Sequence, residues 1–355
     1  MNALKRKIIA RIREQGPINT AQYMEIALGD PEHGYYTRRD PLGRDFITAP
    51  EVSQIFGELI GLFFVQAWED RGEPAQFHFV ELGPGRGTLM ADMLRAAGNV
   101  RRKFVTAAQV LLVETSPVLR RVQAEALSSA RVRWITGFEQ VPADAPLFLM
   151  ANEFFDALPI RQFVKSELGW QERMVTSDED DLRFILSPDT VAPPSPAAAA
   201  DPPKDSVIEI SENAATLVHD ISTRFADFDG VALIIDYGHV TTAFGDTFQA
   251  VKGNAYTDPL VEPGEADLTA HVDFAALARA LAQCNIKGPI TQAEFLDRLG
   301  IRIRAELLKR INPEQRIEVD AAVSRLTHAD QMGTLFKVMA ICDARNQAAL
   351  PGFDE

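Results

Sequence analysis

Five short apolar runs, separated by stretches with helical spacing, constrain the fold of this chain more than any other feature. They are FHFVEL (77–82), QVLLVE (109–114), VRWITG (132–137), PLFLMAN (146–152) and VALIIDYG (231–238). None alternates apolar with polar residues, so each predicted strand is buried on both faces, as in a parallel sheet covered by helices on both sides. The sequence therefore predicts an α/β protein with a doubly wound sheet.

The 355 residues fall into regions around these runs. Residues 1–75 are predicted to form helices joined by an irregular segment, and 76–240 to form the sheet core. Residues 241–355 should be mainly helical and complete the sheet with late strands at NIKGPIT (285–291) and GTLFKVMAICD (333–343). An insertion, 160–205, interrupts the core with hairpin strands and a Pro/Ala-rich loop (188–204) that we expect to be mobile.

Residues 30–50, DPEHGYYTRRDPLGRDFITAP, form a Gly-, Pro- and aromatic-rich segment between two predicted helices. Loops longer than about 12 to 15 residues are uncommon and are often functional. A surface connection and a lid fit the pattern equally well; a lid would place Tyr35, Tyr36 and Phe46 over a ligand. One helix is predicted to follow, with Thr48 as its cap and Pro50 in its first turn.

The first apolar run ends at Glu81 and leads into the turn Gly83-Pro84-Gly85-Arg86-Gly87, just before an amphipathic helix. Glycines there permit a tight turn and close approach of a ligand. The spacing G-x-G-x-G after an acid departs from the dinucleotide fingerprint G-x-G-x-x-G. An acid would repel phosphate but attract a sulfonium and an ammonium group. The predicted ligand is therefore S-adenosylmethionine, with Glu114, at the end of the next strand, accepting the ribose hydroxyls.

The fourth run ends in ANEFFDALPIRQF (151–163), where Asn152 and Glu153 fall at the same predicted sheet edge. Phe154, Phe155 and Asp156 follow directly. An amide and a carboxylate can orient a methyl-accepting nucleophile, while aromatic walls keep water from a sulfonium. A helix cap beside a packed Phe pair would give the same pattern, but the position at the ligand edge favours an acceptor pocket.

The formal net charge of −14 argues against nucleic acid as a main partner, because phosphate binding needs a dense basic surface. It favours a cationic substrate. No apolar run approaches the ~20 residues of a membrane span. Two cysteines suggest no disulfide framework, and no His, Cys, Asp or Glu spacing matches a metal site. We therefore expect a cytoplasmic protein without a resident metal.

Several stretches, in order, resemble one family. They include DPEHGYYTRRDPLGRDFITAPEVSQIFGELIG, ELGPGRGTLMADMLR, VETSPVLRRVQ, ANEFFDALPIRQF, IDYGH, GDTFQAVKGNAY, PGEADLTAHVDF and MGTLFKVMAICD. Together they are similar to the MidA family of S-adenosylmethionine-dependent methyltransferases, which includes the mitochondrial complex I assembly factor. The resemblance covers almost the whole chain and implies a class I methyltransferase sheet with an N-terminal helical region, a hairpin insertion and C-terminal helical additions. It also implies methylation of an arginine on a protein, the 49-kilodalton-type subunit of complex I.

Carried over by position, the resemblance implies that Glu81, Gly83, Pro84, Gly85 and Gly87 line the cofactor. Glu114 would take the ribose, Thr115 and Ser116 would flank the adenine, and Asn152 would reach toward the methyl group. The expected acceptor carboxylates are Glu153 and Asp156, with Asp236 as a third. The residues expected around the substrate are Tyr35, Tyr36, Phe46, Thr48, Phe154 and Phe155.

Rival functions stay open at this point. A nucleotide-dependent oxidoreductase is disfavoured by the glycine spacing, whereas a small-molecule methyltransferase and a non-catalytic assembly chaperone are compatible with the motifs. His239 and His271 could act as acid-base groups, although local caps or ion pairs are the more usual role of such histidines.

Overall fold

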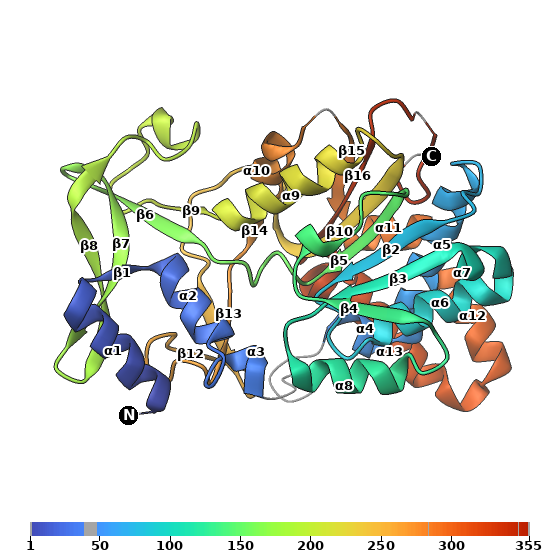
Figure 1. Ribbon diagram of the computed structural model, residues 1–355, viewed down its shortest axis with the longest axis horizontal. Helices are drawn as coiled ribbons and strands as arrows, with labels where there is room; N and C mark the ends of the chain where they lie inside the picture. The colour runs from blue at the N-terminus through green and yellow to red at the C-terminus, as the bar shows by residue number, and fades with distance from the viewer. Residues whose placement is uncertain (1, 39–47, 283, 347, 354–355) are drawn as a thin grey trace.

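The computed structural model describes residues 2–38, 48–282, 284–346 and 348–353. Its core is a twisted sheet with the strand order β15-β16-β10-β5-β2-β3-β4 (Figure 1). The strands from β10 to β4 run parallel, and β16 and β15 join antiparallel beside β10. This arrangement confirms the predicted doubly wound sheet and its late strands. The bounds are β2 Phe77–Leu82, β3 Ala108–Val113, β4 Val132–Ile135, β5 Leu147–Asn152, β10 Gly230–His239, β15 Cys284–Thr291 and β16 Phe336–Asp343, and the short β14 (Val272–Asp273) pairs with β10.

Helices cover both faces of this sheet, because alternate side chains of each strand point to opposite faces and the side chains on both faces are mainly apolar. On one face, Phe79 of β2 and Leu233 of β10 pack into a core with the helices α5, α6 and α11 to α13. On the other face, Val80 and Ile234 pack with α9 and α10. The helices are α4 Ala49–Val52, α5 Gln54–Glu69, α6 Thr88–Val100, α7 Arg102–Ala107, α8 Pro117–Ala126, α9 Glu212–Arg224, α10 Phe274–Ala280, α11 Gln292–Arg298, α12 Ile301–Ile311 and α13 Arg316–Thr327, with short helical turns at Phe138–Gln140, Pro313–Gln315 and Ala329–Gly333.

A small lobe lies beside the sheet, on the left of Figure 1, and is built from segments far apart in the sequence. We use this name for residues 3–38, 161–210 and 249–269. The short β1 pairs with β7, and Ile8, Tyr23 and Val175 share one buried core with Leu268. Its elements are α1 Ala3–Gln15, β1 Ile18–Asn19, α2 Thr20–Gly29, α3 Tyr35–Arg38, β6 Arg161–Ser166, β7 Gly169–Asp178, β8 Asp181–Val191, a helical turn at Ala198–Ala200, β9 Val207–Ile210, β11 Gln249–Lys252, β12 Ala255–Thr257 and β13 Asp267–Thr269.

The predicted single helix after Thr48 is wrong in detail. Thr48 occupies the cap position of α4, but its side chain caps no backbone N–H, and α4 ends at Val52. Ser53 has an extended backbone (φ −163°, ψ 137°), and its hydroxyl accepts a hydrogen bond from the N–H of Ile55 at the start of α5. The serine thus caps a second helix, and the break turns α4 toward the cavity described below.

The first part of the Pro/Ala-rich stretch is also more regular than expected. Strand β8 continues to Val191, which pairs with Trp170 of β7. A register shift between Gln171 and Arg173 accommodates Pro188, and such irregular positions are where a strand tolerates proline. The predicted loop therefore starts after Val191 rather than at Pro188.

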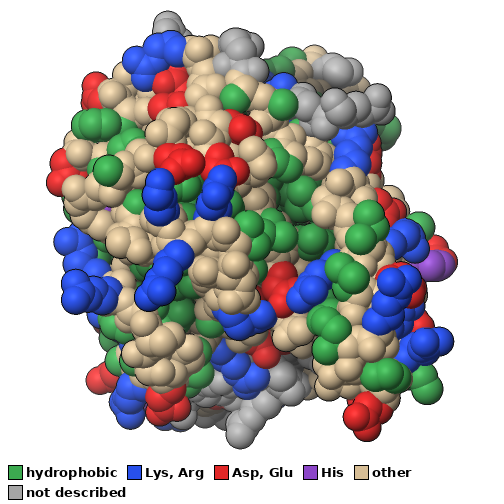
Figure 2. All heavy atoms as spheres, turned by 90° about the vertical axis from the view of Figure 1, so that its right-hand side faces the viewer, with side chains coloured by type: hydrophobic (Ala, Val, Ile, Leu, Met, Phe, Trp, Pro, Cys, Tyr) green, Lys and Arg blue, Asp and Glu red, His purple; other side chains and the backbone are tan. Residues whose placement is uncertain are grey.

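Within the described ranges, no helix is both long and apolar enough to cross a membrane. The face of the molecule shown in Figure 2 carries Lys and Arg side chains interspersed with Asp and Glu. On that face, the described residues therefore present no continuous basic surface of the kind that nucleic acid binding requires.

Candidate active site

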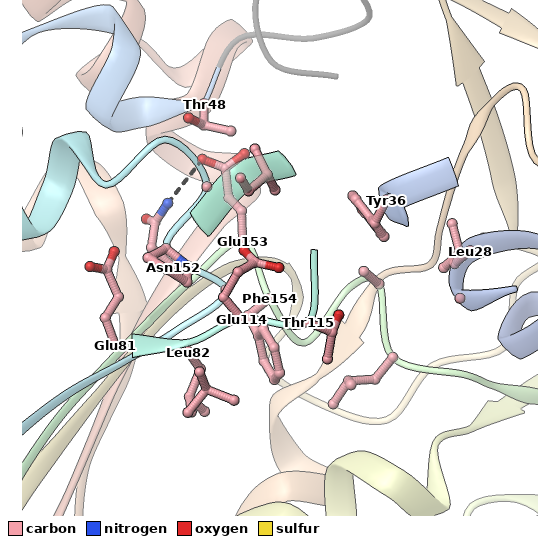
Figure 3. A pocket seen from close by; sticks show the side chains of 18 of the residues that line it. Leu28, Tyr36, Thr48, Glu81, Leu82, Glu114, Thr115, Asn152, Glu153 and Phe154 are labelled. Carbon is pink, nitrogen blue, oxygen red and sulfur yellow. Dashed lines mark hydrogen bonds between the residues drawn. The ribbon is translucent and has the colours of Figure 1, made fainter. Parts of the chain in front are cut away.

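A cavity of about 430 Å³ lies between the carboxyl ends of β2, β3 and β5 and the small lobe. This position is the edge at which open α/β sheets bind ligands. Glu81, Glu114 and Asn152 line the cavity from the sheet side, whereas Leu28 and Tyr36 lie across from them on the small-lobe side (Figure 3). The cavity is thus formed where the two parts of the molecule meet.

The glycine turn forms one wall of the cavity. Gly83, Gly85 and Gly87 have φ values of 60°, 53° and 81°, a left-handed conformation that favours glycine. A Cβ added at Gly83 would lie 2.7 Å from Cδ2 of Phe154. Gly83, Pro84 and Gly85 line the cavity, but Gly87 does not; it stands at the N-terminus of α6. The structure therefore places Gly87 at the start of the helix, and its contact with the cofactor stays a prediction.

Glu114 follows β3 and is held by protein donors. Its Oε1 accepts a hydrogen bond from the N–H of Ser116 at 2.7 Å, and its Oε2 accepts one from Nε2 of Gln123 at 3.1 Å. Burial raises the pKa of Glu114, and these donors oppose the shift. A carboxylate has about four acceptor positions, so Glu114 retains capacity for ribose hydroxyls.

Gln123 is a residue that sequence reasoning missed. It is fully buried on α8, its amide also donates to the carbonyl of Gly85 at 2.7 Å, and its Oε1 accepts from Nε1 of Trp134 at 2.8 Å. Gln123 therefore ties the glycine turn to Glu114. A glutamine on an amphipathic helix carries no sequence signal for such a role, because its partners lie on other elements.

Thr115 lines the cavity, but its neighbour Ser116 does not. Ser116 is fully buried, and its hydroxyl accepts a hydrogen bond from the N–H of Leu119 as the N-cap of α8. The Ser116 side chain is thus used in the first turn of the helix, and its expected place beside the adenine stays a prediction.

Asn152 and Glu153 lie together at the end of β5. Glu153 has a φ of 50°, unusual for a residue with a side chain, and its N–H donates to the carbonyl of Ile235 at 2.9 Å. Its Oε1 accepts hydrogen bonds from the N–H of Ala49 (2.9 Å) and from Nδ2 of Asn152 (3.2 Å; Figure 3). Desolvation raises the pKa of Glu153 to about 7, and the nearby Asp156 adds to the shift.

Two buried acceptor atoms in the cavity wall lack a partner within the described part of the chain. They are Oε2 of Glu81 and Oδ1 of Asn152. Burial raises the pKa of Glu81 to about 8. Buried acceptors normally find donors, so this pair fits a ligand that brings a cationic N–H donor. The ammonium group of S-adenosylmethionine is such a donor.

Asp156 and Asp236 lie behind the cavity rather than in its wall. Both are buried, and Oδ2 of Asp236 accepts hydrogen bonds from the N–H groups of Phe154, Phe155 and Asp156. Burial raises the pKa of both carboxyls, that of Asp156 to about 6. Asp236 thus holds the turn that carries Glu153, and Asp156 belongs to that turn. Contact of either acid with the acceptor stays a prediction.

Only some of the residues expected around the substrate line the cavity. Tyr36, Thr48 and Phe154 line the cavity, but Tyr35 and Phe155 are buried in separate hydrophobic clusters. Phe46 lies outside the described residues. Tyr35 and Tyr36 belong to the short helix α3, not to an open loop, and the Tyr36 hydroxyl donates to Oδ1 of Asp267 at 2.6 Å.

The two histidines are not among the residues that line the cavity. Nε2 of His239 lies 4.0 Å from Oδ2 of Asp273, and the His271 ring packs edge-on against Tyr237. Burial lowers the pKa of both histidines. Across the described ranges, no group of three or more His, Cys, Asp and Glu residues is arranged to hold a metal ion.

A parallel sheet with a bare glycine turn, an acid beside that turn and a second acid after the next strand defines the class of S-adenosylmethionine-dependent methyltransferases. A family model described as "Putative S-adenosyl-L-methionine-dependent methyltransferase" matches residues 59–290. The chain belongs to this methyltransferase family, and its cofactor is S-adenosylmethionine.

Relatives extend the match beyond that range. Protein arginine methyltransferase NDUFAF7, mitochondrial, from Xenopus tropicalis is 36% identical over 371 residues, covering 96% of this chain and 86% of that protein. The human protein of the same name is 37% identical, covering 95% and 82%. A crystal structure of a Burkholderia thailandensis protein bound to S-adenosyl-homocysteine has a TM-score of 0.86 at 28% identity, covering 99% and 95%. These relatives confirm the resemblance to the MidA family.

Proposed function

We propose that this methyltransferase modifies an arginine on a protein. The acceptor is the 49-kilodalton-type subunit of respiratory complex I. The names of the relatives support arginine as the target, and the family resemblance supports complex I assembly. The acidic chain, with a formal net charge of −14, suits a cationic acceptor.

The observation that carries the proposal is the placement of Glu153. Its half-buried carboxylate lines the cavity beside Asn152, and the left-handed backbone at this position fixes its direction. Among the described residues that line the cavity, the charged ones are five glutamates and one arginine, Arg86. A guanidinium would find complementary charge there, and paired hydrogen bonds to a carboxylate are its preferred contact.

The chemistry follows from positioning. S-adenosylmethionine supplies a methyl group activated by a sulfonium. Glu153 would grip the acceptor guanidinium, turn one nitrogen toward the methyl carbon and accept the proton that this nitrogen loses. A carboxyl with a pKa of about 7 is matched to such a role near neutral pH. Phe154 and Tyr36 would limit access of water to the reacting atoms.

Mass spectrometry of complex I subunits from cells with and without this protein tests the proposal. We expect a methylated arginine on the 49-kilodalton-type subunit. The methylation should be lost when the gene is deleted and restored by the wild-type protein. Restoration by the Glu153→Gln variant to wild-type occupancy would exclude the assigned role of this carboxylate. An unchanged methylation pattern in the deletion, with complex I still depleted, would instead favour a non-catalytic assembly chaperone.

A small-molecule acceptor is the second candidate, because a cavity of about 430 Å³ leaves limited space beside a bound cofactor. An uncharged small acceptor would not need the charge of Glu153. Turnover that survives Glu153→Gln with a small uncharged acceptor would favour this function over arginine methylation.

A further inference from the structure

The outer wall of the cavity comes from α2, an element that the glycine motif does not include. Met24, Glu25 and Leu28 face the cavity from this helix. The opposite side of α2 is anchored in the small lobe: Tyr23 and Ala27 are fully buried there, and the Tyr23 hydroxyl donates to the carbonyl of Pro259. A rigid helix therefore presents these side chains across from the turn that carries Glu153.

The helix is also fixed at its start. Asn19 and Gln22 form a reciprocal capping box, in which each side chain accepts a hydrogen bond from the other residue's backbone N–H. The position of Glu25 is consequently set by the fold rather than by a flexible segment.

Most of the cavity glutamates already have protein partners. Oε1 of Glu51 accepts from the Thr88 hydroxyl at 2.6 Å, and the partners of Glu114 and Glu153 are given above. Glu81 is buried beside the glycine turn, where the cofactor is expected. Glu25 differs from all four, because it is exposed and has no hydrogen bond or ion pair with the described residues.

A role for Glu25 in helix stability does not explain its position. On an α-helix, a glutamate pairs with a basic residue three or four positions away. The residues at those positions are Ala21, Gln22, Leu28 and Gly29, and none is basic. With respect to the described part of the chain, Glu25 therefore presents a negative charge without a basic partner at the small-lobe side of the cavity.

We propose that α2 selects the acceptor. The target side chain enters between Leu28 and Phe154, with its nitrogen at Glu153, and Glu25 binds a second cationic group carried by the same acceptor. The acceptor is accordingly a basic peptide segment rather than an isolated arginine. This inference rests on the proposed arginine methylation and adds a recognition contact to it.

Methyl transfer to three synthetic peptides tests the inference. Each peptide holds one arginine in a Gly/Ser-rich context; the second has a lysine two residues from it, and the third a glutamate there. We expect the lysine to lower KM about two- to fivefold in the wild-type protein, the range of an exposed ion pair. Glu25→Gln should remove this preference, and Glu25→Lys should reverse it.

Glu14→Gln is the matched control, because Glu14 is exposed on α1 and does not line the cavity. A lysine preference that persists in Glu25→Gln, or that Glu14→Gln abolishes equally, overturns the role of Glu25 while leaving arginine methylation intact. Absence of transfer from the wild-type protein to every peptide and to the complex I subunit would remove the proposed function itself, and this inference with it.

Discussion

Oδ2 of Asp236, at the end of β10, accepts a hydrogen bond from the backbone N–H of Phe155 at 2.9 Å, across 81 residues of sequence. The N–H groups on either side of Phe155 reach the same oxygen. A carboxylate that collects successive N–H groups acts as a clamp on the turn after β5.

Replacing Asp236 with Asn should loosen this clamp, because Oδ1 also accepts a hydrogen bond from the N–H of Tyr237, and the NH₂ group of an amide must replace one of the two accepting oxygens. We expect a loss of about 1–3 kcal/mol in the free energy of unfolding, the cost of unmatched buried groups. Methyl transfer should fall more steeply than cofactor affinity, because the turn carries Glu153. Urea denaturation, calorimetry with S-adenosylhomocysteine and turnover assays measure the three quantities. Equal loss of cofactor affinity and turnover would show that Asp236 supports the whole site rather than this turn.

Gly83→Ala should weaken cofactor binding at least about tenfold, since the new Cβ would strain a left-handed backbone and displace Phe154. Gly72→Ala provides the control: Gly72 has a φ of 79°, but no atom lies within 4 Å of its added Cβ. Both variants should lose about 1 kcal/mol of stability from backbone strain. Isothermal titration with S-adenosylhomocysteine distinguishes the two variants by their affinity for this ligand. Similar affinities for the two variants would contradict the placement of the ligand beside Gly83.

Glu114→Ala should reduce the affinity for S-adenosylhomocysteine by about 1.5–3 kcal/mol, the usual contribution of hydrogen bonds to a charged group. Glu114→Gln keeps the shape but not the charge and should lose less. A change below a few tenths of a kcal/mol in the alanine variant would mean that the ribose is held elsewhere.

The rate of transfer to an arginine peptide should depend on the ionisation of Glu153. With a pKa of about 7, this carboxyl is mainly protonated and neutral below that pH and mainly charged above it. Only the charged form pairs with a guanidinium, so kcat/KM should rise as the pH increases through about 7. Profiles from pH 5.5 to 9 for wild type and Glu153→Gln measure this. A wild-type rise that the glutamine variant shares would assign the titration to another group.

The sequence predicted the features that depend on local pattern. The apolar runs and the glycine turn, with Glu81 before it, lie in a few consecutive residues, so their strand and ligand roles could be inferred without knowledge of the fold. Asp236 was placed at the right sheet edge, but the direction of its side chain depends on Phe155, far away in sequence. Likewise, the break at Ser53 and the pairing of β1 with β7 reflect tertiary contacts that override local propensity. The sequence did not single out Glu25, because exposed glutamates are common on helices. Its proposed role depends on its position across the cavity from Glu153, which only the tertiary structure shows.

The place of β16 has a consequence for synthesis of the chain. Strand β10 (Gly230–His239) pairs with β5 on one side and with β16 (Phe336–Asp343) on the other. When β10 leaves the ribosome, its second partner has not yet been translated. One edge of a strongly apolar strand is then open, and open edges invite pairing with other chains. A premature stop before Phe336 would therefore leave this edge permanently exposed, and the expected result is an aggregating product rather than a smaller folded enzyme.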